Sequence, residues 1–152
     1  MIDLTILYED NHCLAVAKPA PLLTQGVPEG IPTLEAAVKA YIKERYRKPG
    51  NVYLGIPHRL DRPVSGVVLF ARSTKGAQRL AEQFQKHQVR KVYWALVEGE
   101  LAESEGRWED WLLKLPEQSR TEVVSGDTPG ARQAILEFRR LRVGGGETLL
   151  EL

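Results

Sequence analysis

The chain has 152 residues, a length that suits one domain with a substantial apolar core. Its 21 basic and 20 acidic residues leave a net charge of +1, so composition by itself does not indicate a nucleic-acid-binding protein. No apolar run is long enough to span a membrane, and the single cysteine, Cys13, excludes an intrachain disulfide and favours the cytosol.

Two short strands are predicted near the start of the chain, at 5–8 and 13–17, joined by a turn. A loop rich in proline and glycine follows over 19–32, and Thr33 can cap a helix that runs to about Arg47. This helix is expected to be amphipathic, because its apolar residues repeat at helical spacing: Leu34, Val38, Tyr41 and Ile42.

The segment from Pro57 to Gly66 places one carboxylate, Asp61, between two guanidinium groups, Arg59 and Arg62. Prolines and glycine keep this segment out of regular helix. The apolar run that follows, 66–71, predicts a buried strand, so Asp61 is expected on a stiffened loop at the mouth of that strand.

After this strand, Thr74 can cap a second helix whose apolar stripe is expected to face the core: Ala77, Leu80, Ala81 and Phe84. From residue 89 onward the pattern changes to strands. The segment 92–97 is apolar on both faces and is expected to be buried on both. Further strands are predicted at 107–113, 121–124, 133–141 and 147–152. Antiparallel connections with two flanking helices indicate an α+β fold.

The predicted loop is well placed for chemistry, because loops held by a rigid scaffold carry most reactive groups. The flanking arginines favour the ionised form of Asp61, which gives an anion suited to nucleophilic attack. The alternative is a surface turn whose charges pair in solvent, and composition alone favours that alternative. The histidines and Cys13 show no metal-ligand spacing, so no metal is expected.

The loop resembles the His-Arg-Leu-Asp-Arg-x-Thr-Ser-Gly signature of the RluA-type pseudouridine synthases, with Val64 where the family usually has threonine. Other segments are similar to this family and occur in the same order: 6–12 with 17–20, 70–75, and 91–99. The resemblance implies the N-terminal part of the family's catalytic domain, with a mixed, largely antiparallel sheet, flanking helices and an active cleft across the sheet.

The same resemblance implies an enzyme that isomerises a specific uridine in structured ribosomal or transfer RNA, with no cofactor. Asp61 would be the catalytic nucleophile, and Tyr93 would stack on the target uracil and assist proton transfer. Arg59 would fill the gap that the flipped base leaves, since a planar cation can stack on bases. Arg62 and His58 would orient the loop or contact phosphate.

Alternatives remain for several of these residues. Arg59 could simply pair with Asp61, and Tyr93 could be a core aromatic on a buried strand. Asp61 could attack C1′, add to the uracil or assist a glycal intermediate. A carbohydrate hydrolase would need a second carboxylate facing Asp61, and nothing in the placement of Glu35 or Glu98 selects either one.

In this family, a strand like 148–152 runs into a segment that adds a basic residue to the active site, and the sequence stops at Leu152. We therefore expect 1–152 to be a single catalytic domain that is incomplete at its C-terminus, with no separate N-terminal RNA-binding domain. The alternative function is a catalytically inactive RNA-binding remnant of the same family. A cytoplasmic monomer with RNA as its partner, away from membranes, is expected.

Overall fold

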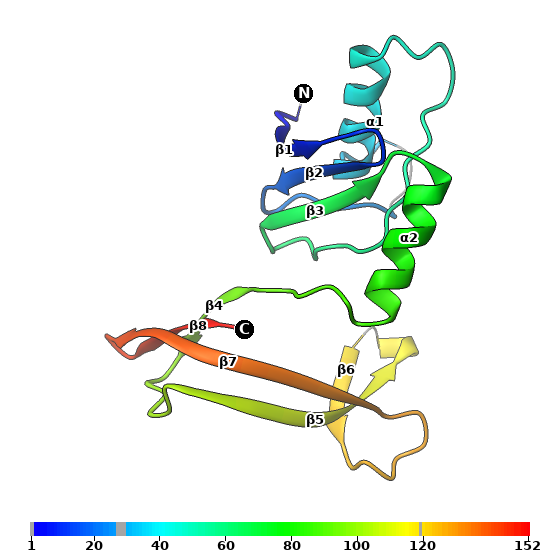
Figure 1. Cartoon of the computed structure of the whole chain (residues 1–152). Coiled ribbons are helices and arrows are strands. Elements are labelled where there is room, and N and C mark those ends of the chain that lie inside the picture. The colour runs from blue at the N-terminus through cyan, green and yellow to red at the C-terminus, as the bar shows by residue number, and fades with distance from the viewer. Residues whose placement is uncertain (1, 27–29, 119) are drawn as a thin grey trace. The chain divides into compact units, whose positions relative to one another are not determined.

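The computed structural model describes residues 2–26, 30–118 and 120–152 (Figure 1), so the predicted loop 19–32 falls partly outside the described residues. The chain forms two compact units, Met1–Val89 and Arg90–Leu152. Each unit is described below by itself. In the described part, no helix is long and apolar enough to cross a membrane.

The first unit contains a three-stranded antiparallel sheet in the order β1-β2-β3, and both helices of the chain (Figure 1). The strands and helices have these bounds: β1 Thr5–Glu9, β2 Cys13–Lys18, α1 Leu34–Arg45, β3 Gly66–Ala71 and α2 Thr74–Gln85. The predicted elements of this half therefore all exist, with ends that differ by a few residues.

The core of the first unit lies between α1 and one face of the sheet. In β2 and β3, Leu14 pairs with Phe70 and Val16 pairs with Val68, so these four buried residues share a face. The helix contributes buried residues one turn apart, which confirms the predicted stripe: Leu34, Val38 and Ile42. Leu60, which lies outside any regular element, belongs to the same cluster.

Both helices begin at a side-chain cap. The hydroxyl of Thr33 accepts a hydrogen bond from the amide of Ala36 at 3.1 Å, as the sequence predicts. For α2, the prediction of Thr74 as the cap is wrong by one residue. The preceding Ser73 has the extended backbone of a cap and accepts from the amide of Gly76 at 3.1 Å.

The second unit is a five-stranded antiparallel sheet in the order β4-β8-β7-β5-β6 (Figure 1). Its strands have these bounds: β4 Trp94–Glu98, β5 Glu105–Leu115, β6 Arg120–Val124, β7 Arg132–Gly144 and β8 Glu147–Glu151. A 3₁₀ turn, Pro116–Gln118, follows β5. The tight turn from β7 into β8 contains Gly145 and Gly146 with φ of 68° and 78°, a region that glycine enters without steric cost.

Strand register separates an apolar face of this sheet from a charged one. Phe138 and Leu150 are buried on the apolar face, where the Phe138 ring stacks on Trp108 with centroids 4.2 Å apart. The charged face carries ion pairs between neighbouring residues, such as Arg139 with Glu151 at 2.8 Å. Such exposed pairs contribute little to stability.

The prediction that 92–97 is buried on both faces is wrong. Trp94 is 73% exposed and Leu96 is 57% exposed. The strand β4 lies at the edge of its sheet, where it pairs with β8. An apolar run on both faces shows that a strand is suited to burial, but tertiary structure decides whether another layer covers each face.

The α+β class predicted from the sequence is confirmed. Every pairing between the named strands is antiparallel, and two helices accompany the sheets. The strands form two antiparallel sheets, one in each unit.

Candidate active site

The carboxylate of Asp61 lies on the loop between Gly55 and the start of β3. Gly55 exchanges two backbone hydrogen bonds of 2.8 Å with Ala71 at the far end of that strand. Leu60 is only 8% exposed and packs into the core, whereas Arg59 and Asp61 on either side of it are exposed. One apolar anchor therefore turns its two charged neighbours outward.

A buried threonine from the preceding loop holds the backbone of Leu60 at both of its polar groups. The hydroxyl of Thr24 donates to the carbonyl of Leu60 at 2.7 Å, and the amide of Leu60 donates back at 3.3 Å. The threonine is itself fixed by α1, because the amides of Leu34 and Glu35 donate to the carbonyls of Leu23 and Thr24. The N-terminus of the helix thus anchors the segment that holds the loop.

A buried lysine holds the loop on the other side of Asp61. Lys18, at the end of β2, is 1% exposed, and its Nζ donates to the carbonyls of Pro19, Leu22 and Arg62 at 3.3, 2.5 and 3.3 Å. In return, Nε of Arg62 donates to the carbonyl of Pro21 at 3.3 Å. The two loops are therefore joined by hydrogen bonds in both directions.

The charges of Lys18 and Asp61 interact through space. Burial lowers the pKa of Lys18, because an ammonium group loses hydration there, and the negative charge of Asp61 partly opposes this lowering. In the described part of the chain, Asp61 makes no ion pair with Arg59 or Arg62.

The loop closes through a turn and a glycine. The amide of Val64 donates to the carbonyl of Asp61 at 3.1 Å. Gly66 has φ of 147°, and a Cβ at that position would lie 3.3 Å from Cδ1 of Leu60. A larger residue at 66 would therefore strain the backbone and press on the side chain that anchors the loop.

His58 faces the protein. Its ring stacks on Phe84 of α2 with centroids 4.7 Å apart, and its Nε2 accepts from the amide of Leu69 at 2.9 Å. That hydrogen bond assigns the ring proton of a neutral His58 to Nδ1. The half-buried ring ties the loop to both β3 and α2.

Tyr93 belongs to the second unit, whereas the loop residues belong to the first. Its amide and carbonyl exchange hydrogen bonds of 3.0 and 2.8 Å with Leu152, which extends the β4–β8 pairing by one step. Its side chain is 40% exposed, so it is not a buried core aromatic. The structure thus brings Asp61 together with Arg59, Arg62 and His58 on one loop, and it places Tyr93 in the other unit.

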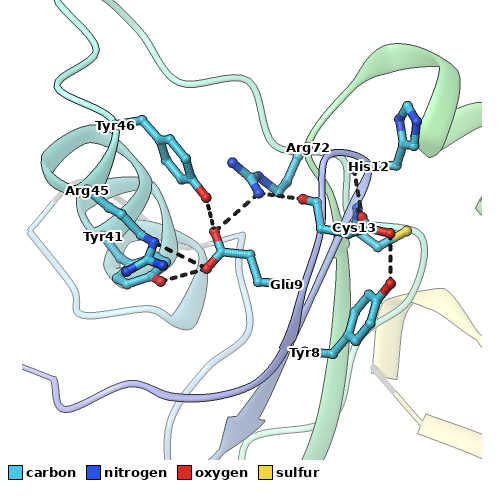
Figure 2. A network of polar contacts seen from close by, with 9 residues as sticks. Tyr8, Glu9, His12, Cys13, Tyr41, Arg45, Tyr46 and Arg72 are labelled. Carbon is cyan, nitrogen blue, oxygen red and sulfur yellow. Dashed lines mark hydrogen bonds and ion pairs between the residues drawn. The ribbon is translucent and has the colours of Figure 1, made fainter.

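A second polar cluster surrounds Glu9 at the opposite end of β2 (Figure 2). The carboxylate accepts from the hydroxyls of Tyr41 and Tyr46 at 2.7 Å each, and it pairs with Arg72 at 3.2 Å and Arg45 at 3.5 Å. Burial raises the pKa of Glu9, but these hydrogen bonds and positive charges outweigh it, so the pKa lies below the usual range.

This cluster joins β1, α1 and the residue after β3, and its carboxylate is engaged by protein groups on both oxygens (Figure 2). The neighbouring Asp10 is equally engaged, because it accepts from the amides of His12 and Cys13 and the hydroxyl of Tyr8. We therefore assign these residues to the stability of the first unit. Across the described residues, no group of three or more potential ligands could hold a metal ion.

Sequence reasoning did not assign Lys18 and Thr24 to the support of the loop that carries Asp61. Lys18 follows Leu14 and Val16 at a spacing of two, so strand alternation places it on the same buried face. That signal was present in the sequence. Thr24 carries no such signal, since it lies in an irregular loop whose partners are set by tertiary structure.

Comparison with known proteins gives consistent matches. A family model described as RNA pseudouridylate synthase matches residues 12–152. The tRNA pseudouridine synthase C of Haemophilus ducreyi is 38% identical over 102 residues, which cover 67% of this chain and 40% of that protein. An RNA pseudouridine synthase of Zymomonas mobilis, described as uncharacterized, is 33% identical over 145 residues, which cover 95% and 64%.

The chain spans about half the length of the curated relatives it matches. Among solved structures, Human RNA Pseudouridylate Synthase Domain Containing 4 is similar with a TM-score of 0.78 and 21% identity, covering 96% of this chain and 57% of that one. At this identity, the likeness supports the fold alone.

Proposed function

Since the chain belongs to the RNA pseudouridylate synthase family, we propose that this protein isomerises a uridine in structured RNA. In this reaction the bond between ribose C1′ and uracil N1 breaks and C1′ then joins C5; the hydrogen on C5 leaves as a proton and N1 takes up a proton. Several curated relatives are named as tRNA pseudouridine synthases, which favours transfer RNA over ribosomal RNA as the substrate.

We assign the nucleophile of this reaction to Asp61. The observation that carries the assignment is an exposed carboxylate between two anchored residues, on a loop within the segment that matches the family. The minimum catalytic group that this reaction requires is one carboxylate, which either attacks as a nucleophile or stabilises the positive charge that develops at C1′. Its protein neighbours leave the Asp61 side chain exposed, so an extruded nucleoside can approach it.

Arg59 is proposed to enter the RNA stack when the uridine turns out. Removing a base from the stack costs a few kcal/mol, and a planar cation that fills the gap offsets part of that cost. The exposure of Arg59 and the lack of an ion pair to Asp61 in the described chain support this role.

The remaining assignments keep their predicted roles. Tyr93 is proposed to stack on the uracil and assist proton transfer, which is compatible with its exposed ring. Arg62 and His58 are proposed to orient the loop and contact phosphate, and their hydrogen bonds to Pro21 and from Leu69 support the orienting part. Both units are proposed to form one catalytic domain, acting as a cytoplasmic monomer.

The test is release of tritium from RNA that carries 5-tritiated uridine, run beside an RNA-binding assay. Asp61→Asn is expected to abolish release while leaving the Kd for RNA nearly unchanged, and Asp3→Asn, at another exposed position, is the matched control. Continued turnover by Asp61→Asn would remove that residue from the mechanism. RNA binding without any release by the wild-type chain would favour the inactive binding module instead.

The same assay tests the two other side chains. Arg59→Ala is expected to slow release from structured RNA more than from an RNA whose uridine is already exposed. Tyr93→Phe is expected to lower kcat more than affinity. Equal effects on the two RNAs would contradict the flipping role, and equal losses of rate and affinity would assign Tyr93 to packing.

A further inference from the structure

We propose that Thr24 and Lys18 are positioning residues that fix the main chain on the two sides of Asp61, an inference that rests on the proposed function. Thr24 binds the residue before the carboxylate, and Lys18 binds the residue after it. Neither side chain is exposed to substrate, so both act through the loop that carries Asp61.

Thr24 fixes Leu60 through the only two polar groups that this residue has. Its hydroxyl donates to the Leu60 carbonyl and accepts from the Leu60 amide, so the peptide units on both sides of Leu60 are oriented. The threonine is 3% exposed and its own carbonyl accepts from Glu35 in the first turn of α1. Because α1 packs on the core, this contact transmits the rigidity of the core to the loop.

Lys18 fixes Arg62 through the carbonyl of that residue. The same ammonium also binds the carbonyls of Pro19 and Leu22, so its position is set from three directions. With Leu60 and Arg62 both held, the loop has little freedom at Asp61 other than the rotation of its side chain. An attacking group gains rate when it is held near its target in this way.

The charge of Lys18 also interacts with the charge of Asp61 through space. The ammonium is buried and all three of its hydrogen bonds go to neutral carbonyl groups. Asp61 is the acidic group whose charge acts on Lys18, and this interaction favours the charged form of the lysine. The two contacts therefore have separable consequences: Thr24 sets geometry alone, and Lys18 sets geometry and charge.

The chain contains a matched control for Thr24. Thr148 in β8 is fully buried, its hydroxyl donates to the carbonyl of Gly99 at 2.7 Å, and it accepts from the amide of Leu101 at 3.0 Å. Thr24→Val and Thr148→Val thus remove the same hydroxyl and the same two kinds of hydrogen bond. Only the first of them lies beside Asp61.

The experiment measures kcat, the Kd for RNA and hydrogen exchange of the Leu60 and Leu101 amides, with kcat normalised to the folded fraction. Thr24→Val is expected to speed exchange at Leu60 and to lower kcat about tenfold, which corresponds to about 1.4 kcal/mol of transition-state stabilisation. Its Kd for RNA should stay within about twofold, a shift below 0.5 kcal/mol by the same conversion. Thr24→Ser, which keeps the hydroxyl, should restore both values.

Thr148→Val is expected to speed exchange at Leu101 and to leave kcat unchanged. Lys18→Met, which keeps the length of the side chain and removes its charge, should lower kcat further than Thr24→Val does. Lys39→Met is its control, because that lysine pairs with Glu35 on the exposed side of α1.

Faster exchange at Leu60 with an unchanged kcat would overturn the positioning role while leaving the proposed function standing. Unchanged exchange in Thr24→Val would overturn the contact itself. Equal losses of kcat in Thr24→Val and Thr148→Val would also overturn it, since both would then reflect general destabilisation. No turnover by the wild-type chain would instead overturn the proposed function, and with it the catalytic part of this inference.

Discussion

The two units of the chain are built on different principles. The first encloses an apolar cluster between a small sheet and α1, and nearly all of the fully buried apolar side chains of the described chain belong to it. The second is a larger sheet, and among its described large apolar residues only Phe138 and Leu150 are buried. Its strands are joined mainly by ladders of backbone hydrogen bonds and exposed ion pairs.

The difference shows what a reactive loop requires from its scaffold. Asp61 lies on the unit with the enclosed core, where Leu60 can be buried and where Thr24 and Lys18 can be held without solvent. The open sheet offers one comparable anchor among the described residues, Thr148, which holds Gly99 and Leu101 but has no buried lysine beside it. Buried polar side chains are costly unless they are fully hydrogen-bonded, and the first unit meets that condition at both Thr24 and Lys18.

The largest expected effect tests the enclosed core against the open sheet with one chemical change. Phe70→Ala should lower the free energy of unfolding by about 3–5 kcal/mol, because it empties a fully buried site. Phe138→Ala should cost less, since its ring stacks on Trp108, which is 40% exposed and can relax into the space.

Urea unfolding can follow the two units separately. Both helices lie in the first unit, so circular dichroism at the helix bands reports on it, and all three tryptophans lie in the second, so their fluorescence reports on that one. Equal shifts for the two variants in both signals would contradict the contrast between the units.

A smaller effect is expected from adding a single methyl group at a glycine in each unit. A Cβ on Gly55 would lie 2.6 Å from Cβ of Ala77, an atom that cannot rotate away, so Gly55→Ala should cost about 1–3 kcal/mol. A Cβ on Gly106 would meet the Phe138 ring at 2.7 Å. That ring lies on a partly open face and can swing aside, so Gly106→Ala should cost less in the same urea experiment. A larger cost at Gly106 would mean that the open sheet is the more tightly packed of the two.

The smallest effect compares one acidic residue from each unit. Glu9→Gln should lower the free energy of unfolding by about 1–2 kcal/mol at pH 7, because charge-assisted hydrogen bonds from two tyrosines are weakened. Glu151→Gln should cause no resolvable change, since its pair with Arg139 is exposed to solvent.

The pH dependence of that difference follows from the lowered pKa of Glu9. A carboxyl group whose pKa is lower in the folded state stabilises the fold above its unfolded pKa, near 4.5, and loses this contribution as the pH falls through the folded value. The gap between wild type and Glu9→Gln should therefore be constant from neutral pH to about pH 5 and shrink below it. A gap that widens in acid would reverse the sign of the assigned shift.

Much of the fold could be predicted from the sequence, because period and capping are local signals. The stripe of α1 and its Thr33 cap, and the strand 66–71, all follow from spacing within a few residues. The exposure of the segment 92–97 could not be predicted in the same way. An apolar run indicates that a strand is suited to burial, and only the sheet order shows that β4 is an edge.

The residues of the candidate site also differ in whether local sequence or tertiary structure identifies them. The charged residues of the loop could be found from their motif, because a signature lies within one short segment. Thr24 could not, since its partner Leu60 is 36 residues away and the contact exists only after the two loops meet. Lys18 falls between these cases: strand alternation places it inside, but nothing local indicates that it binds Arg62.

The double tether between the segment 18–24 and the loop around Asp61 has a consequence for how this protein can vary. Because both ends of that segment are fixed, by β2 on one side and by α1 on the other, an inserted residue would shift either the hydroxyl or the ammonium out of reach. The turn 125–130 between β6 and β7 does not hold the loop around Asp61. Insertions and deletions should therefore be tolerated in the turn 125–130 and be rare in the segment 18–24, although the two stretches are of similar length.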